Sequence, residues 1–271
     1  MLRYAVVTSD RRGYANLFIE KTARAGSQRA GLVAVVYCHA QTAGSPRATR
    51  RLWRKLLKAV RLGPLGTWQG FRMRRWFQDD VAERLETGDL FERCRALGVP
   101  LVEIPRFADP EAQARVRALD LDLGISMGNG YIARSFYSIP RFGMINIHHE
   151  LLPEYKGAQP VVWQLHDGSR TTGFTIHEID DRIDTGRILV REEVPIIFRD
   201  TLHATAVETA ASVKMRSIEA LARLLDDLPA ARAAALPNEG GRTFTTPGSI
   251  AVLRIFWNFR RLRGRPAERA H

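Results

Sequence analysis

The sequence predicts an α/β fold: a Rossmann-like, open and mostly parallel twisted sheet with helices on both faces. Short apolar runs recur along the chain at 4–8, 32–37, 101–104, 121–126 and 142–147, as buried parallel strands require. Segments with helical spacing separate these runs. At 271 residues the chain suits one large domain with a smaller addition. We therefore expect this sheet to carry a basic helical insertion at 40–78 and a short C-terminal appendage at 229–271.

The first forty residues predict a right-handed βαβ unit. A strand at 4–8 leads through a loop at 9–13 into a helix at 14–25 and a second strand at 32–37. The loop lacks the three spaced glycines of a dinucleotide-binding fingerprint, so we do not expect NAD. It carries Arg11 and Arg12, whose charges could hold a phosphate; a solvated turn is the alternative.

The insertion at 40–78 contains no aspartate or glutamate before Asp79, and its apolar residues recur at helical spacing. We interpret it as a basic amphipathic hairpin, broken at Gly-Pro-Leu-Gly. Three roles stay open: a lid over an anionic substrate, a surface that docks on membrane or nucleic acid, or an insertion that packs its apolar stripe on the domain. Its basic residues are Arg47, Arg50, Arg51, Arg54, Lys55, Lys58, Arg61, Arg72, Arg74 and Arg75.

The middle of the chain continues the alternation of helices and strands. Helices are expected at 79–97, 109–119, 161–166 and 201–228, and further strands at 171–179 and 188–197. The segment 150–159 is too rich in proline and glycine for a helix and is long enough to wall a site. A loop at 127–132 follows the strand at 121–126. Ligands bind beyond the carboxyl ends of strands in such sheets, which makes this loop a candidate binding segment.

The character of the chain changes after Leu236. A loop at 237–241 and a short strand at 243–247 precede an apolar, arginine-bearing helix at 250–262. This helix could pack on the insertion, lie across a homodimer, or anchor the protein in a membrane interface.

Charge and cysteine content limit the partners and the compartment. Lysine and arginine exceed aspartate and glutamate by 41 − 29 = 12, which favours an anionic partner. Two cysteines give no disulfide framework, no leading segment resembles a signal peptide, and no apolar run reaches the ~20 residues of a membrane span. We expect a cytoplasmic protein, with a peripheral position at the inner membrane face as an option. No His, Cys or Glu spacing suggests a metal site.

Three polar side chains stand out in the stretch 143–190. Asn146 and His148 lie two apart in a strand and so share one face. Asp184 follows in Asp-Thr-Gly, a turn just before the next apolar run. An amide can bind an oxyanion, an imidazole can move a proton, and a carboxylate can orient the imidazole. This set suits acyl transfer to an amine.

The segments NIHHELLPEYKGAQP and TGFTIHEIDDRIDTGRIL resemble the N10-formyltetrahydrofolate-dependent formyltransferases. The resemblance covers about residues 95–200 and is weaker over the first 40. It places Asn146, His148 and Asp184 on the family's catalytic triad and implies N10-formyltetrahydrofolate as formyl donor. His149-Glu150 departs from the Pro-Ser that the family commonly has there. The implied folate-pocket residues are Met127, Gly128, Gly130, Tyr131, Ile132, Ile179, Asp180 and Asp181, and the candidate acceptor-binding residues are Arg11, Arg12, Tyr14, Lys156, Gly157 and Gln159.

The resemblance leaves the amine acceptor open. Methionyl-tRNA formyltransferases have a C-terminal barrel domain, whereas only 271 − 228 = 43 residues follow Leu228 here. The glycine loop of glycinamide ribonucleotide formyltransferases is missing. We therefore expect an anionic amine acceptor, namely a nucleotide-linked or lipid-linked amino sugar, bound by a catalytic domain at 1–228. A membrane surface could meet 46–77 and 250–263, and nucleic acid is less favoured. A methionyl-tRNA formyltransferase-like enzyme that lacks the usual C-terminal domain is one alternative. A non-catalytic basic protein that binds membrane or RNA is the alternative from another class.

Overall fold

The computed structural model describes residues 1–25, 29–40, 48–157 and 160–264. The predicted acceptor residue Gln159, insertion residues 41–47 and tail residues 265–271 lie outside this part of the chain.

The elements, in chain order, are β1 (Leu2–Thr8), α1 (Ala15–Ala25), β2 (Ala30–Ala40), α2 (Ala48–Arg75), the π-helix η1 (Trp76–Asp80), α3 (Val81–Arg84), α4 (Leu90–Leu97), β3 (Leu101–Arg106), α5 (Pro110–Arg117), β4 (Leu123–Ser126), α6 (Arg134–Tyr137), β5 (Met144–His148), β6 (Tyr155–Lys156), α7 (Val162–Asp167), β7 (Thr171–Glu178), β8 (Ile188–Pro195), α8 (Leu202–Asp226), α9 (Leu228–Ala233), β9 (Arg242–Thr243) and α10 (Ser249–Arg263).

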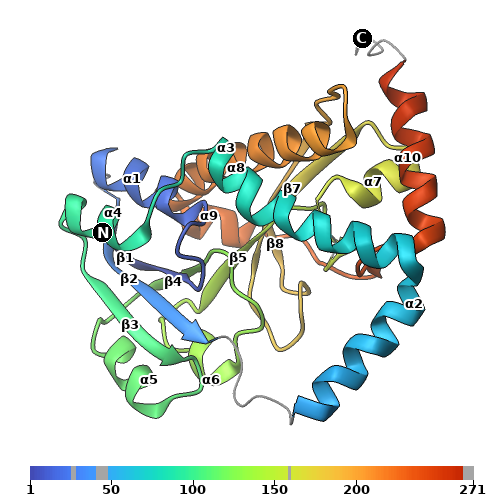
Figure 1. Ribbon diagram of the computed structural model, residues 1–271. Helices are drawn as coiled ribbons and strands as arrows, with labels where there is room; N and C mark the ends of the chain where they lie inside the picture. The colour runs from blue at the N-terminus through green and yellow to red at the C-terminus, as the bar shows by residue number, and fades with distance from the viewer. Residues whose placement is uncertain (26–28, 41–47, 158–159, 265–271) are drawn as a thin grey trace, which may run out of the picture.

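The main sheet has seven strands in the order β3-β2-β1-β4-β5-β7-β8 (Figure 1). Neighbours from β3 to β5 are parallel, whereas β7 is antiparallel to both β5 and β8. The predicted fold class, an open and mostly parallel α/β sheet, is confirmed.

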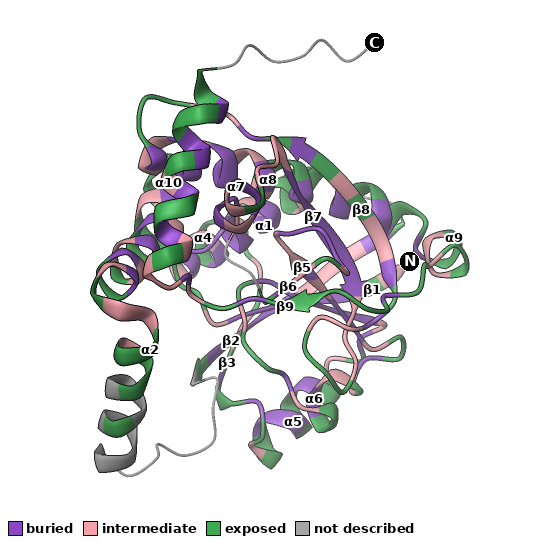
Figure 2. Cartoon of the chain, turned by 90° about the vertical axis from the view of Figure 1, so that its right-hand side faces the viewer, coloured by how far each residue is buried: buried purple, intermediate pink, exposed green. Residues whose placement is uncertain are grey.

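Helices cover both faces of this sheet because its strands are apolar on both sides. In β1, Tyr4 and Val6 face the core shared with α1, α4 and α8, while Ala5 and Val7 face the core shared with α5 and α6. A third cluster joins the start of α8 to α7, α10 and the end of α2. In Figure 2 buried residues colour much of strand β7 and of the helices α7 and α8.

The basic insertion breaks at Gly63-Pro64 as predicted, but its two helical stretches meet at a kink and do not form the predicted hairpin. Helix α2 changes direction at Gly63, whose φ of 69° is open to glycine, and Pro64 follows it. The chain does not turn back at this point, and the helix continues into η1 and α3 (Figure 1). The prediction of one helix over 79–97 is also wrong, because α3 ends at Arg84 and a separate helix, α4, begins after Asp89. That residue begins α4 by accepting hydrogen bonds from the backbone of Phe91 and Glu92.

The C-terminal segment packs closely on the insertion. The Ser249 hydroxyl donates to the Leu62 carbonyl (3.0 Å) and accepts from the Gly66 amide (3.1 Å). Gly66 lies so close to Gly248 that an added Cβ would come within 2.9 Å of its backbone, and a Cβ on Gly70 would reach the Thr246 methyl at 2.6 Å. Small residues therefore allow α2 and the start of α10 to interlock.

Candidate active site

A pocket of about 460 Å³ opens at the carboxyl ends of β1, β4 and β5. Its walls come from the loops after these strands, from β7 and the loop that follows it, from the end of α2 as it continues into η1, and from α8. This position is the one expected for a ligand site in an open α/β sheet. Asn146, His148 and Asp184 all line it, so the fold brings together the three residues that the sequence singled out.

Asn146 is oriented by His177 on the neighbouring strand β7. The Nδ1 of His177 lies 2.8 Å from the Glu178 carbonyl, which can only accept, so this nitrogen carries the proton. Burial lowers the pKa of His177 and keeps the ring neutral. Its Nε2 then accepts from the Asn146 side-chain NH2 at 3.3 Å. One amide hydrogen of Asn146 is thereby held, and the other remains for a ligand.

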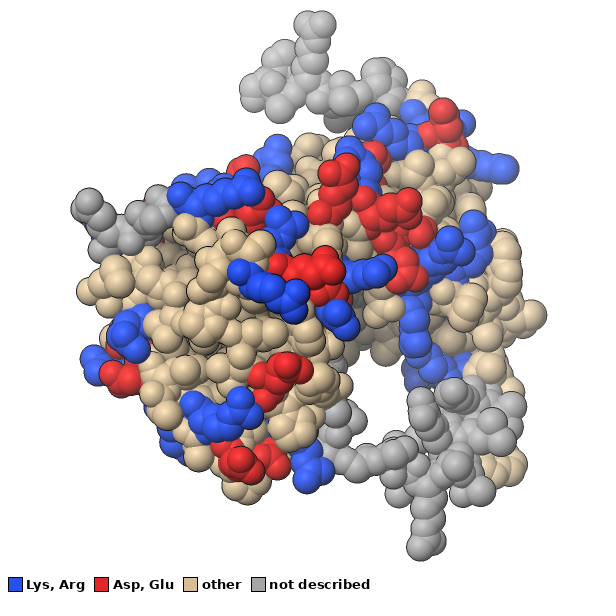
Figure 3. Space-filling model, turned by 60° about the vertical axis from the view of Figure 1, so that its left-hand side comes forward, with Lys and Arg blue, Asp and Glu red and all other residues tan. Residues whose placement is uncertain are grey.

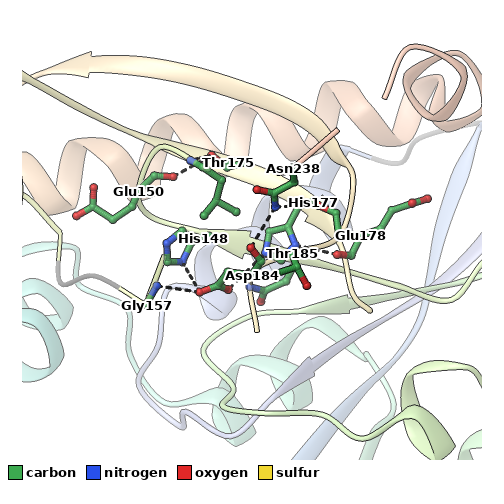
Figure 4. Close-up of polar contacts among 12 residues, drawn as sticks. His148, Glu150, Gly157, Thr175, His177, Glu178, Asp184, Thr185 and Asn238 are labelled. Carbon is green, nitrogen blue, oxygen red and sulfur yellow. Dashed lines mark hydrogen bonds and ion pairs between the residues drawn. The ribbon is translucent and has the colours of Figure 1, made fainter. Parts of the chain in front are cut away.

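His148 is oriented by the chain segment that follows it. Its Nε2 donates to the Tyr155 carbonyl at 2.8 Å, so the lone pair of the neutral ring lies on Nδ1. This Nδ1 is 3.7 Å from Oδ2 of Asp184, too long for a direct hydrogen bond but close enough for strong attraction once the ring is protonated. The pair is nearly buried and is shown in Figure 4. His148 can therefore accept a proton at Nδ1 beside a carboxylate.

Asp184 occupies a tight loop and has a left-handed backbone, with φ of 54°. Its Oδ2 accepts from the Gly157 amide at 3.1 Å, and its Oδ1 lies 3.7 Å from His177. The loop is held from behind by Asn238, whose buried NH2 donates to the carbonyls of Asp184 (3.1 Å) and Gly186 (3.0 Å) (Figure 4). Asn238 thus fixes the backbone of a candidate catalytic residue from the C-terminal segment.

The predicted folate-pocket residues divide into two groups. Met127 is fully buried in the core and Asp181 is engaged by Tyr137 (2.6 Å) and Arg134 (3.6 Å), so the pocket lining includes neither. The other six line the pocket: Gly128, Gly130, Tyr131, Ile132, Ile179 and Asp180.

The candidate acceptor residues are more scattered. Tyr14 and Gly157 line the pocket, whereas Arg11 and Arg12 line an adjoining groove. Arg11 pairs with Asp89 and stacks over Phe91, with 4.7 Å between its guanidinium carbon and the ring centroid. The Lys156 side chain is buried outside the pocket lining.

The sequence analysis missed Lys214 of α8. Its ammonium lies 5.4 Å from the centre of the Tyr14 ring, lines the pocket, and has a pKa lowered to about 8 because burial disfavours its charge. His149 packs edge-on to Tyr14, and burial also drives its pKa well below the usual value. A lysine in a long amphipathic helix carries no local signal of a site, so only the packing reveals it.

Glu150 is the second half of the departure from the family pattern, and it is fully buried. It is hydrogen-bonded by Gln164 and, at 3.4 Å, by the Thr172 hydroxyl. Burial raises its pKa well above the usual value, which favours the protonated carboxyl. Through these contacts Glu150 joins the segment after β5 to α7 and β7.

No group of three or more His, Cys, Asp or Glu residues in the described ranges is arranged to hold a metal ion. Within those same ranges, no helix is both long and apolar enough to cross a bilayer. The arrangement at the pocket offers a neutral hydrogen-bond donor, a proton acceptor and a carboxylate. These are the groups needed to move an acyl group between two nitrogen atoms.

The chain belongs to the formyl transferase family, whose model matches residues 2–219. A methionyl-tRNA formyltransferase of Clavibacter michiganensis is 32% identical over 68% of this chain and 57% of that protein, so the chain spans little more than half of that relative. A sugar N-formyltransferase structure from Shewanella sp. FDAARGOS_354 is similar over 96% of this chain and 88% of that one (TM-score 0.55, 16% identity). An N-formyltransferase of Helicobacter canadensis, solved with folinic acid and dTDP-3-aminofucose, is similar over 90% and 71% (TM-score 0.52, 13% identity).

Proposed function

We propose that the protein transfers a formyl group from N10-formyltetrahydrofolate to a primary amine. The observation that carries this proposal is the convergence of Asn146, His148 and Asp184 on one pocket at the strand ends. Family membership supplies the reaction class, and these side chains supply the chemistry.

The amine nitrogen attacks the formyl carbon, and the carbonyl π electrons move to oxygen. The free amide hydrogen of Asn146 binds the resulting oxyanion; loss of one such donor typically lowers a rate by ~10²–10³. His148 takes the proton from the attacking nitrogen at Nδ1, and Asp184 stabilises the imidazolium. The C–N10 bond then breaks as His148 returns the proton to N10. The products are the formamide and tetrahydrofolate.

The folate fits the side of the pocket formed by the glycine-bearing loop and Ile179. Backbone at Gly128 and Gly130 permits close approach of a flat ring, while Ile132 and Ile179 supply apolar surface. The Helicobacter neighbour, solved with folinic acid, supports a folate donor.

The acceptor enters beside Tyr14 and Lys214, and we propose that it is the amine of a nucleotide-linked or lipid-linked amino sugar. The Lys214 ammonium provides a partly desolvated positive charge for an anionic acceptor. The fold match with a sugar N-formyltransferase extends over 96% of this chain.

Methionyl-tRNA is the second candidate acceptor, because the curated relatives carry that name. The basic sequence of α2 would suit the phosphates of an RNA acceptor end. A non-catalytic binding protein is disfavoured by the preserved set of three pocket side chains.

A spectroscopic assay tests these acceptors together. N10-formyltetrahydrofolate is mixed with the protein and with dTDP- and UDP-amino sugars, glycinamide ribonucleotide or charged initiator tRNA, and tetrahydrofolate release is followed. We expect turnover with an amino sugar that is lost in Asn146→Ala and His148→Ala. Turnover with tRNA alone would select the second candidate, and failure to bind folate would refute the proposed function.

A further inference from the structure

Helices α2 and α10 expose a set of large apolar side chains along one side of the molecule. Eight of the fourteen exposed large hydrophobic residues in the described part of the chain belong to these two helices. Within each helical stretch the spacing is three or four residues, which places the side chains on a common face. They are Trp53, Leu57 and Val60 before the kink of α2, Trp68 and Phe71 after it, and Ile250, Leu253 and Trp257 on α10.

This exposed face is a second apolar face and not the one by which the helices pack on the protein. Helix α10 already buries Ile255, Phe259 and Leu262 in the cluster that includes residues of α7 and α8. Yet Leu253 and Trp257, on its other side, remain 60% and 65% exposed. An exposed set of apolar side chains opposite a packed face is typical of a surface that binds a partner.

The two helices lie one after the other along the same side of the molecule. Figure 1 shows α10 above and the first half of α2 extending below it, and Figure 2 shows both from the outside. The start of α10 is hydrogen-bonded to α2 near its kink, through Ser249, Leu62 and Gly66, so the two helices are held together.

The charge on these helices has one sign. The sequences of α2 and α10 contain arginine and lysine but no aspartate or glutamate. By contrast, acidic and basic residues alternate over the body of the protein in the view of Figure 3. The guanidinium carbon of Arg72 lies 4.6 Å from the centre of the Trp68 ring, and that of Arg261 lies 5.2 Å from Trp257. Arg75 and Arg263 are partly neutralised by Asp80 (3.4 Å) and Asp200 (3.5 Å).

We propose that the face formed by α2 and α10 binds the surface of an anionic lipid bilayer. Tryptophan and leucine side chains enter the boundary between headgroups and acyl chains, while arginines beside them reach lipid phosphates. An RNA partner would satisfy the arginines but would leave Leu57, Ile250 and Leu253 in water. The combination of apolar and cationic side chains therefore fits a bilayer.

The chain that forms part of the binding face also leads to the pocket. Helix α2 runs directly into η1, and Phe77 and Gln78 of η1 line the pocket. Membrane binding itself does not depend on which acceptor is used.

Co-sedimentation of the full-length protein with lipid vesicles tests the proposal. One set of vesicles is phosphatidylcholine alone and the other contains equal parts of phosphatidylcholine and phosphatidylglycerol. We expect strong partition onto the anionic vesicles at low salt, weakening as salt is added, with a blue shift of tryptophan emission. Leu253→Ser combined with Trp257→Ser should weaken partition about tenfold or more. Met215→Ser, which removes an exposed apolar side chain from α8, should leave it unchanged.

Three results would overturn the proposal. The first is an absence of partition onto anionic vesicles at low salt. The second is partition that the double substitution does not weaken. The third is tight binding to an RNA duplex by a protein that binds neither kind of vesicle. Because the assay needs neither folate nor acceptor, its failure would leave the proposed formyl transfer standing.

Discussion

Replacing Asn238 by aspartate tests whether the C-terminal segment positions the candidate catalytic carboxylate. The NH2 group of Asn238 is buried and donates to the carbonyls of Asp184 and Gly186. Aspartate has nearly the same shape but presents oxygens to these two acceptors. Each hydrogen bond is worth about 0.5–1.5 kcal/mol, so the loss of both lowers the free energy of unfolding by about 1–3 kcal/mol.

We expect Asn238→Asp to lower the rate of formyl transfer by more than its loss of stability alone would explain. Without Asn238 the loop at 180–186 can shift Asp184 away from His148. A displacement of about 1 Å in a catalytic group can cost about 10²-fold in rate. We therefore expect Asn238→Asp to lower kcat for formyl transfer by one to two orders of magnitude and to weaken binding of 5-formyltetrahydrofolate, a stable analogue of the donor.

Asn258→Asp is the matched control. Asn258 is also buried and donates its NH2 to a carbonyl, that of His166, at 2.8 Å, but it lies in α10 outside the pocket lining. Both variants are compared by urea denaturation, titration of 5-formyltetrahydrofolate and turnover under conditions where each is folded. If Asn238→Asp binds and turns over as well as Asn258→Asp, the positioning role of Asn238 is refuted.

Three further substitutions have defined outcomes. Asn146→Ala should lower kcat by ~10²–10³ with little change in folate affinity; an unchanged kcat would remove Asn146 from the oxyanion role. Lys214→Met should raise the KM for an anionic acceptor. Because burial lowers the lysine pKa from 10.5 to about 8, its removal should also stabilise the protein by roughly 3 kcal/mol below pH 8. That advantage should vanish as pH rises from 8 to 10.5, and a constant advantage would contradict the buried-cation argument. Glu150→Gln should stabilise the protein increasingly as pH rises above 4.5, because burial raises the pKa of the folded carboxyl above its unfolded value. Urea denaturation across pH should detect no such trend if Glu150 is ionised in the native state.

The fold class and the central pocket residues Asn146 and His148 could be predicted because their signals are local. Asn146 and His148 share a strand face, which their spacing alone establishes. Loop 127–132 follows a strand whose carboxyl end must lie at the pocket edge. These features need no knowledge of distant packing.

The remaining features depend on contacts between distant parts of the chain. Asn238 supports Asp184 across 54 positions, and nothing near it in sequence marks that role. The sequence indicated that Arg11 could bind a phosphate, but in the fold its guanidinium pairs with Asp89, which is distant in the sequence. The predicted hairpin failed for a different reason: Gly63 and Pro64 often end a helix, but here packing against α10 carries the helix on past the kink.

The close packing of α2 on α10 limits how these segments can be exchanged between related proteins. Leu62 and Ser249, which share a hydrogen bond, are 187 positions apart, and Gly66 and Gly70 leave no room for other side chains where the two helices meet. Neither segment can be transplanted into a related enzyme without the other, since each would arrive with a face shaped to a missing neighbour. The two segments must therefore be transferred together, and we expect only chimaeras that carry both of them to fold.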